Sequence, residues 1–403
     1  MKILFITSHI THPSSPMFLR NQTGFGYMVF DIAKHVAQDN HVDMFVANTF
    51  TPNLQIEGVN ILKRSWLSYF SGLSVECIYN AVKYVLRYKL PLKRTLRELY
   101  MYTSISQLGK NIKDYDVVHI HGCSEITDSA IFLCKKENTP FVVTLHGLNS
   151  FEDSIKLHKS LKMYERDFLK TAGSNGYPVS FISTGNLKTV EDFIGHNVNS
   201  FRVICNGCDV ERQDSSLNIR KEYNIPDDDF VFVFVGNVSH NKNQLQVARA
   251  WAIMPEHIRN KCRVLFVGRY TNEDDLILYI QDNKYNDHLI LCGLQPKEKV
   301  KDFYQASNAS ILTSITEGFG LSIIEGFVYG KPNITFADLP AVQDLYDPKA
   351  MALVHDRKDS TLSKVMTEVT QMSFDNEYIR NHASKFSYEV MTKKYLELYN
   401  SVK

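Results

Sequence analysis

Two acidic side chains, Glu317 and Glu325, stand in a glycine-containing segment with seven residues between them. The apolar run that ends near Ser314 is typical of a strand, and a helix is expected over 321–329, closed by Gly330. That helix is apolar almost all round, which predicts burial, and yet it holds Glu325 in its middle. Because a buried carboxylate is costly without a partner, we expect Glu325 to meet a ligand or a cation.

The turn between the two glutamates is suited to binding an anion. Backbone amides at the start of the expected helix, around Leu321, have no intrahelical partners, and the helix dipole favours negative charge there. Gly318 and Gly320, on either side of Phe319, allow a ligand to approach the backbone closely. A loop carboxylate, an anion site and an interior carboxylate thus follow one another along the chain. This order suits a sugar, a diphosphate and a ribose.

Short apolar runs that alternate with helix-like segments must position these groups. Runs that are apolar on both faces are what a parallel sheet covered on both sides requires. The sequence therefore predicts an α/β protein with two consecutive doubly wound domains, each opening with a strand, a polar or glycine-containing loop and a helix. The expected strands are 3–7, 42–47, 117–120, 141–145, 179–183, 201–205, 230–235, 264–267, 289–292, 309–312 and 333–336.

The composition is that of a globular protein without a strong field of its own. The 403 residues include 45 basic and 44 acidic side chains, a net charge of +1, so no nucleic-acid partner is expected. The longest apolar stretches are far shorter than the ~20 residues of a membrane-spanning helix, and the first residues have no signal-peptide pattern. Seven scattered cysteines fit a reducing compartment, and we expect a cytoplasmic chain.

One segment, 63–97, departs from this balance, with eight basic residues against one acid, Glu76. Basic and aromatic residues on predicted helices suit an anionic lipid surface, so peripheral contact with the inner face of the cell membrane is the preferred interpretation. A solvated helical face with the aromatic side chains packed inward, and a surface for a protein partner, are the alternatives. The basic residues are Lys63, Arg64, Lys83, Arg87, Lys89, Lys93, Arg94 and Arg97, and the aromatic residues are Trp66, Tyr69, Phe70, Tyr79, Tyr84 and Tyr88.

The sequence Ser314-Ile-Thr-Glu-Gly-Phe-Gly-Leu-Ser-Ile-Ile-Glu-Gly, ending at Gly330-Lys-Pro332, resembles the two-glutamate signature of retaining nucleotide-sugar glycosyltransferases of family four. The resemblance implies the GT-B fold, in which two Rossmann-like doubly wound parallel-sheet domains face each other across a cleft. On this basis we expect an N-terminal acceptor domain over 1–210, onto which a terminal helix at 385–403 packs back. A C-terminal nucleotide-sugar donor domain is expected over 211–384.

Other stretches resemble the same family in order. The loop Thr23-Gly24-Phe25-Gly26 is similar to the first-domain glycine loop that approaches the donor diphosphate. His146, in Thr-Leu-His-Gly, stands where the family has a residue that contacts the donor sugar. The loop after Gly236 is similar to the basic loop that holds the donor phosphates, with Lys242 in the place of the phosphate-binding lysine. Asn237 stands where arginine is usual, so the resemblance implies one cation fewer.

The resemblance implies transfer of a sugar from a UDP- or GDP-linked donor to a hydroxyl of a glycan or polyprenyl-linked acceptor, with retention, in surface polysaccharide biosynthesis. Negative charge grows on the departing diphosphate, and stabilising it is the main task. The expected catalytic residues are Glu317, His146 and Lys242. The expected donor-binding residues are Gly24, Asn237, Lys242, Gly318, Phe319, Gly320, Leu321 and Glu325, with Glu317 on the sugar and Glu325 on the ribose.

No metal and no other cofactor are expected. Asp227-Asp228-Asp229 contains an Asp-x-Asp pattern but follows a proline and precedes a strand, which favours a polar turn. His119 and His121 share one strand face without an apparent third ligand. A catalytically silent GT-B partner protein, a sugar-nucleotide epimerase and a phosphorylase are the alternatives. An NAD-dependent enzyme is disfavoured, because no Gly-x-Gly-x-x-Gly follows the first strand.

Overall fold

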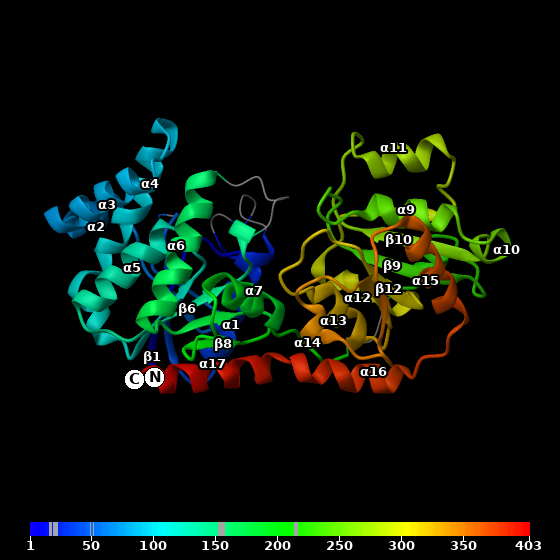
Figure 1. Cartoon of the computed structure of the whole chain (residues 1–403). Coiled ribbons are helices and arrows are strands. Elements are labelled where there is room, and N and C mark those ends of the chain that lie inside the picture. Colours follow the sequence, from blue (N-terminus) through cyan, green and yellow to red (C-terminus); the bar gives the residue numbers. More distant parts are fainter. Residues whose placement is uncertain (16–17, 19–22, 49, 51, 152–157, 213–216) are drawn as a thin grey trace. The chain divides into compact units, whose positions relative to one another are not determined.

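The computed structural model describes residues 1–15, 18, 23–48, 50, 52–151, 158–212 and 217–403, except the side chains of 92, 93 and 110. The described chain divides into two compact units (Figure 1). The first consists of Met1–Gly207 and Tyr388–Lys403, and the second is Cys208–Ser387. At the change of unit Cys208 forms an isolated parallel bridge with Ser387 and its amide donates to the Phe386 carbonyl at 2.9 Å.

The first unit is built on an eight-stranded sheet in the order β3-β4-β2-β1-β5-β6-β7-β8. Every strand pair is parallel except β3 with β4. The order reverses between β1 and β5, which makes this the topological switch point of the sheet. The strands are β1 (Lys2–Thr7), β2 (His41–Val46), β3 (Leu54–Ile56), β4 (Val59–Ile61), β5 (Val117–His121), β6 (Phe141–Leu145), β7 (Val179–Phe181) and β8 (Phe201–Val203).

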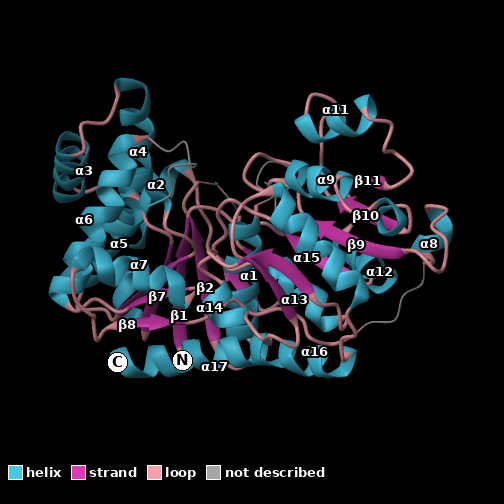
Figure 2. Ribbon diagram, turned by 45° about the vertical axis from the view of Figure 1, so that its right-hand side comes forward, coloured by secondary structure: helices cyan, strands magenta, loops and turns pink. Residues whose placement is uncertain are grey.

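Helices lie around this sheet (Figure 2). Between β4 and β5 the chain adds several consecutive helices, α2, α3, α4 and η1, rather than the single crossover helix of a minimal unit. The helices of the first unit are α1 (Gly24–Val36), α2 (Trp66–Gly72), α3 (Val75–Arg87), α4 (Leu92–Ser104), η1 (Ile105–Asp114), α5 (Glu125–Lys136), η2 (Asn149–Phe151), α6 (Lys159–Asn175), α7 (Thr184–Ile194) and α17 (Tyr388–Val402).

The second unit has an all-parallel sheet of six strands in the order β11-β10-β9-β12-β13-β14. This is the doubly wound order of a dinucleotide-binding fold, with its switch point between β9 and β12. The loops that follow these two strands therefore meet at one edge of the sheet. The strands are β9 (Phe230–Val235), β10 (Cys262–Val267), β11 (Leu289–Gly293), β12 (Ala309–Leu312), β13 (Asn333–Phe336) and β14 (Met351–Val354).

Most helices of the second unit follow the strands in the βαβ manner that right-handed crossovers require. They are α8 (Ile219–Glu222), α9 (Gln244–Ala252), α10 (Glu256–Arg259), α11 (Asp275–Asp282), α12 (Lys297–Ala306), α13 (Leu321–Val328), α14 (Val342–Leu345), α15 (Asp359–Gln371), α16 (Asn376–Ala383) and η3 (Ser384–Phe386). None of the helices in the described ranges is long and apolar enough to cross a membrane.

The terminal helix α17 packs on the first unit. Tyr388 stacks on His35 of α1, with ring centroids 4.0 Å apart, and its hydroxyl donates to Asp31 at 2.9 Å. At the other end of the helix, the Tyr399 hydroxyl lies 2.7 Å from Nδ1 of His119 on β5. The two tyrosines thus fasten both ends of α17 to α1 and β5 of the first unit.

Candidate functional site

The predicted residues Lys242 and Glu317 lie together at the switch point of the second unit. Lys242 is in the loop after β9 and Glu317 in the loop after β12. The Lys242 Nζ donates to Oε2 of Glu317 at 2.5 Å, and both side chains are mostly buried. The Ser314 hydroxyl also donates to Oε2, at 3.3 Å. The pair places one cation and one carboxylate side by side at the edge where such folds bind ligands.

The two loops are held against each other by residues that the sequence did not single out. The Asn241 side chain accepts from the Thr316 amide and donates to the Thr316 carbonyl, both at 3.1 Å. Arg357 donates to the carbonyls of Ser314 and Ile315 at 3.0 and 3.1 Å and pairs with Asp338. These residues position Glu317 through backbone contacts, which leave no periodic signal in the sequence.

Helix α13 begins beside this pair, and no side chain of the described residues caps its first backbone amides. Its N-cap residue is Gly320, which has a left-handed φ of 82°. A Cβ at this position would lie 3.2 Å from Cδ1 of Ile323, so glycine fits best. Leu321 and Gly318 are half-buried. The Phe319 side chain is 2% exposed and packs edge-on against Phe386, so only the Phe319 backbone can contact a ligand.

Glu325 is half-buried on α13, less enclosed than the apolar composition of the helix predicts. Its partner is a phenol, because the buried Tyr304 hydroxyl donates to Oε2 at 3.1 Å and is shared with the Ser322 carbonyl at 2.9 Å. Burial raises the pKa of Glu325 above its ordinary value, against the opposing effects of the Tyr304 hydrogen bond and of Lys297 and Lys242. Within the described part of the chain, Tyr304 is the hydrogen-bond donor found for this carboxylate, which can accept further bonds.

Asn237, in the loop after β9, is exposed and holds the neighbouring loop after β10. Its Oδ1 accepts from the backbone amide of Arg269 at 2.9 Å. The residue before Arg269 is Gly268, whose backbone lies close to that of Gly236. A Cβ built on Gly268 would lie 2.2 Å from the Gly236 carbonyl oxygen. Arg269 therefore lies next to the loop in which Asn237 stands in place of the arginine usual in the resembling family. The two residues are neighbours because β9 and β10 pair, which the sequence alone does not show.

In the first unit, Gly24 opens helix α1 at the switch point after β1. Thr23 caps the helix by accepting from the Gly26 amide at 3.0 Å, and its hydroxyl lies 2.8 Å from Nε2 of His9. Among the described residues, no atom lies within 4 Å of a Cβ built on Gly24, so they leave the backbone there open to an incoming group. A Cβ on Gly26 would lie 2.4 Å from the Thr11 hydroxyl, so Gly26 serves close packing.

His146 follows β6 and belongs to a cluster of three histidines. Its Nε2 lies 2.9 Å from Nδ1 of His121, and its ring meets Phe25 edge-on at 5.0 Å. His119 bonds to Thr144 at 2.6 Å. Burial lowers the pKa of His146 to about 4, and burial together with neighbouring histidines holds the pKa of His119 and His121 well below 6.5. His146 is therefore a neutral hydrogen-bonding group near neutral pH.

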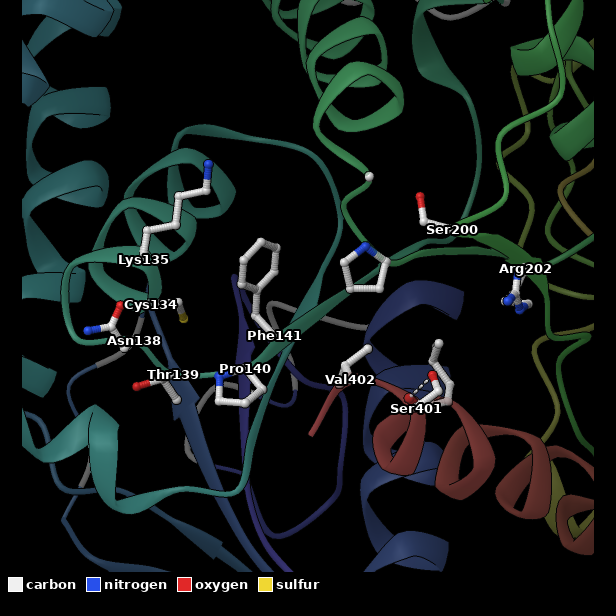
Figure 3. A pocket seen from close by; sticks show the side chains of 13 residues that line it. Cys134, Lys135, Asn138, Thr139, Pro140, Phe141, Ser200, Arg202, Ser401 and Val402 are labelled. Atoms are coloured by element: carbon white, nitrogen blue, oxygen red, sulfur yellow. Dashed lines mark hydrogen bonds between the residues drawn. The ribbon is translucent and has the colours of Figure 1, made fainter.

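Two further observations concern metals and cavities in the described part of the chain. No group of three or more His, Cys, Asp or Glu residues that could hold a metal ion is found there. One pocket of the first unit lies at the amino-terminal ends of β6, β7 and β8, whereas His146 follows the carboxyl end of β6 (Figure 3). Pro140, Pro178 and Ser200 line it, each directly preceding a strand, and none of the predicted site residues does.

The segment 63–97 is divided by the structure into a buried and an exposed part. Arg64 is 2% exposed and donates to the carbonyls of Val46 and Ala47, so its assignment to the surface was wrong. The end of β2 supplies these acceptors, which a local pattern cannot show. Tyr84 and Tyr88 lie in the core, as the inward-packing alternative expects. The side chain of Lys93 lies outside the described residues.

Solved glycosyltransferase structures share the fold of this chain. Sucrose-phosphate synthase from Thermosynechococcus elongatus has a TM-score of 0.72 at 17% identity, covering 99% of this chain and 98% of that chain. HepE from Anabaena, in complex with UDP-glucose, has a TM-score of 0.68 at 16% identity and covers 100% of both chains. The two doubly wound units are therefore those of the GT-B class.

Sequence comparison gives the family within this class. Residues 23–212 match the model for Glycosyltransferase Family 4, and residues 215–386 match the model for Glycosyl transferases group 1. The O-antigen biosynthesis glycosyltransferase WclY of Escherichia coli is 24% identical over 305 residues, which cover 74% of this chain and 82% of WclY. The chain belongs to the family-four glycosyltransferases, which confirms the resemblance.

Proposed function

We propose that the protein transfers a sugar, with retention at the anomeric carbon, from a UDP- or GDP-linked donor to a hydroxyl of a glycan or polyprenyl-linked acceptor in surface polysaccharide biosynthesis. The pathway is supported by the O-antigen role in the name of WclY, and a UDP-linked donor by the UDP-glucose bound to HepE. The proposed donor site needs no metal, since a lysine and backbone amides supply the positive charge.

The observation that carries this proposal is the Lys242–Glu317 pair beside the uncapped start of α13. A diphosphate placed there meets the Lys242 ammonium and the amides at 318–321, which favour the charge of the departing nucleotide. Displaced from Lys242, the Glu317 carboxylate accepts hydrogen bonds from sugar hydroxyls instead. Cation and carboxylate thus act on the two sides of the bond that breaks.

The remaining residues have supporting roles. Glu325 accepts hydrogen bonds from the ribose hydroxyls while Tyr304 holds its carboxylate in place. In the first unit, neutral His146 contacts the donor sugar and the open backbone at Gly24 approaches the diphosphate. A donor phosphate oxygen takes the acceptor proton, and no side chain forms a covalent intermediate.

The test is Lys242→Met, with Lys364→Met as the matched control because Lys364 is an exposed lysine of α15 paired with the exposed Glu368. Loss of one charge-assisted contact of about 1.5–3 kcal/mol predicts roughly 10- to 150-fold weaker binding of UDP or GDP. Calorimetry measures the affinity, and released nucleotide in the presence of EDTA measures turnover. Equal affinities for both variants and the parent would remove Lys242 from the site.

Retention is tested separately on the product. The glycosidic bond fixes the anomeric configuration of the transferred sugar, and NMR couplings at its anomeric carbon are expected to show the same configuration as in the donor. An inverted product, or activity that disappears with EDTA and returns with a divalent cation, would contradict the proposed mechanism while leaving the family assignment intact.

A further inference from the structure

Helix α3 has two apolar sides, and only one of them is used inside the molecule. Cys77, Ala81 and Tyr84 are buried on the inner side. At 100° per residue, a second set falls within one sector of about 100° on the outer side, and all its members are exposed. The outer set consists of Val75, Ile78, Tyr79, Val82 and Leu86.

Helix α2 extends this apolar surface. Trp66, Leu67 and Phe70 are 59%, 82% and 62% exposed. The other side of the helix is fastened to the unit, since the Tyr69 hydroxyl lies 2.7 Å from Thr103 and a Cβ on Gly72 would meet the η1 backbone at 2.7 Å. The outward side chains are thus held outward by specific contacts. We call this set, Trp66, Leu67 and Phe70 with the outer set of α3, the α2–α3 face.

The charges around the α2–α3 face are mainly positive. Lys63, Lys83, Lys89 and Arg97 are exposed, and no ion pair involves them within the described residues. Glu76, the acidic residue of the segment 63–97, is exposed and forms an ion pair with Lys136. Large apolar side chains, including tryptophan, bordered by lysine and arginine are what the interface of an anionic bilayer binds.

We propose that the α2–α3 face inserts into the headgroup region of an anionic membrane, with Lys63, Lys83 and Lys89 on the lipid phosphates. A second copy of this chain is the less suitable occupant, because a two-fold pairing of the face would bring these lysines against each other. The α2–α3 face is separate from the hydrophobic core of the unit, because the inner side of α3 is already buried in that core.

The position of the face fits a lipid-linked acceptor, a point that rests on the proposed function. Helix α2 begins directly after β4, at the carboxyl edge of the sheet, where His146 also follows β6. The buried Arg64 ties this start to the end of β2 through the Val46 and Ala47 carbonyls. Lipid bound by the face is therefore held next to the edge that carries the site residues of this unit.

The experiment is flotation of the full chain with vesicles of phosphatidylglycerol and phosphatidylcholine, without donor or acceptor, so its result is independent of glycosyl transfer. The variant L67S/L86S changes two of the most exposed apolar side chains, and L278S/M372S, on the second unit, is the matched control. We expect L67S/L86S to bind at least about tenfold more weakly and the control to bind like the parent. K83E/K89E is expected to weaken binding about tenfold at low salt and less at high salt.

Parent-like binding of L67S/L86S would overturn the proposal, as would equal binding of the parent to vesicles of phosphatidylcholine alone. Light scattering on the same samples tests the other occupant. A dimer of the parent that dissociates in L67S/L86S, together with no flotation, would assign the face to a second copy and also overturn the proposal. An unchanged thermal midpoint confirms that the exposed substitutions leave the fold intact.

Discussion

Glu325→Gln is expected to weaken nucleotide binding and to stabilise the protein in the same variant. The carboxylate is half-buried, it accepts a hydrogen bond from the Tyr304 hydroxyl, and burial raises its pKa. Glutamine keeps the shape and still accepts from Tyr304, but it carries no charge. The ionised carboxylate is therefore expected to strengthen nucleotide binding and to lower the free energy of unfolding, and the two effects are measured separately.

The affinity change follows from the hydrogen bonds proposed to the ribose. Replacing charge-assisted bonds by neutral ones costs about 1–2 kcal/mol, or roughly 5- to 30-fold in the dissociation constant of UDP or GDP. Because the hydroxyls favour the ionised form, binding to the parent weakens as the pH falls through the raised pKa of Glu325. The Glu325→Gln variant lacks this contribution. Calorimetry at several pH values measures both statements.

The stability change has the opposite sign. A carboxyl whose pKa is raised in the folded state stabilises the fold fully only below its unfolded pKa, and this contribution is lost as the pH rises through the folded value. At neutral pH, Glu325→Gln is therefore more stable than the parent, and the gain disappears in acid. Urea unfolding measures it, with Glu368→Gln on the exposed face of α15 as control. A variant that is less stable at neutral pH, or binds UDP and GDP normally, would refute the reasoning.

Two further predictions concern backbone and histidines. Gly320→Ala should lower the free energy of unfolding by about 1–2 kcal/mol, because Gly320 has a left-handed φ of 82°. Urea unfolding measures this loss against Gly24→Ala, where a Cβ meets no atom of the described residues within 4 Å, and equal losses in the two variants would contradict the prediction. His119, His121 and His146 are neutral when folded, so stability should decrease as the pH falls from about 6.5, their unfolded value, towards 4. A kcat/KM profile with an inflection near pH 6.5 that disappears in His146→Gln would contradict the lowered pKa.

The sequence predicted the layers of the fold well, because buried parallel strands are apolar on both faces. All eleven expected strands are present. Three were missed. β3 and β4 have three residues each, too few to show a pattern, and β14 (Met351–Val354) consists largely of residues equally common in helices.

The residues assigned to the site from the sequence remain predictions, and the contacts among them could not be predicted from the sequence. Lys242 and Glu317 are far apart in the chain, and only the pairing of β9 with β12 brings their loops together. Arginine is usually found at the surface, so the sequence does not indicate that Arg64 is buried. Its burial depends on backbone carbonyls at the end of β2, which accept its hydrogen bonds. Glu325 was expected to need a cation or ligand, whereas the structure gives it the hydroxyl of Tyr304 from the preceding helix.

The Lys242–Glu317 pair also bears on selectivity between intact and spent donor. In the proposed pose, a nucleotide without a sugar binds the Lys242 ammonium through its phosphates and leaves the mostly buried Glu317 carboxylate without its ion-pair partner. A nucleotide sugar binds both side chains, because its hydroxyls donate hydrogen bonds to Glu317. In the proposed mechanism, Lys242 and Glu317 can pair again once the sugar has left, and this pairing competes with binding of the remaining diphosphate. On this proposal, the Lys242–Glu317 pair of the free protein favours release of the nucleotide product over product inhibition.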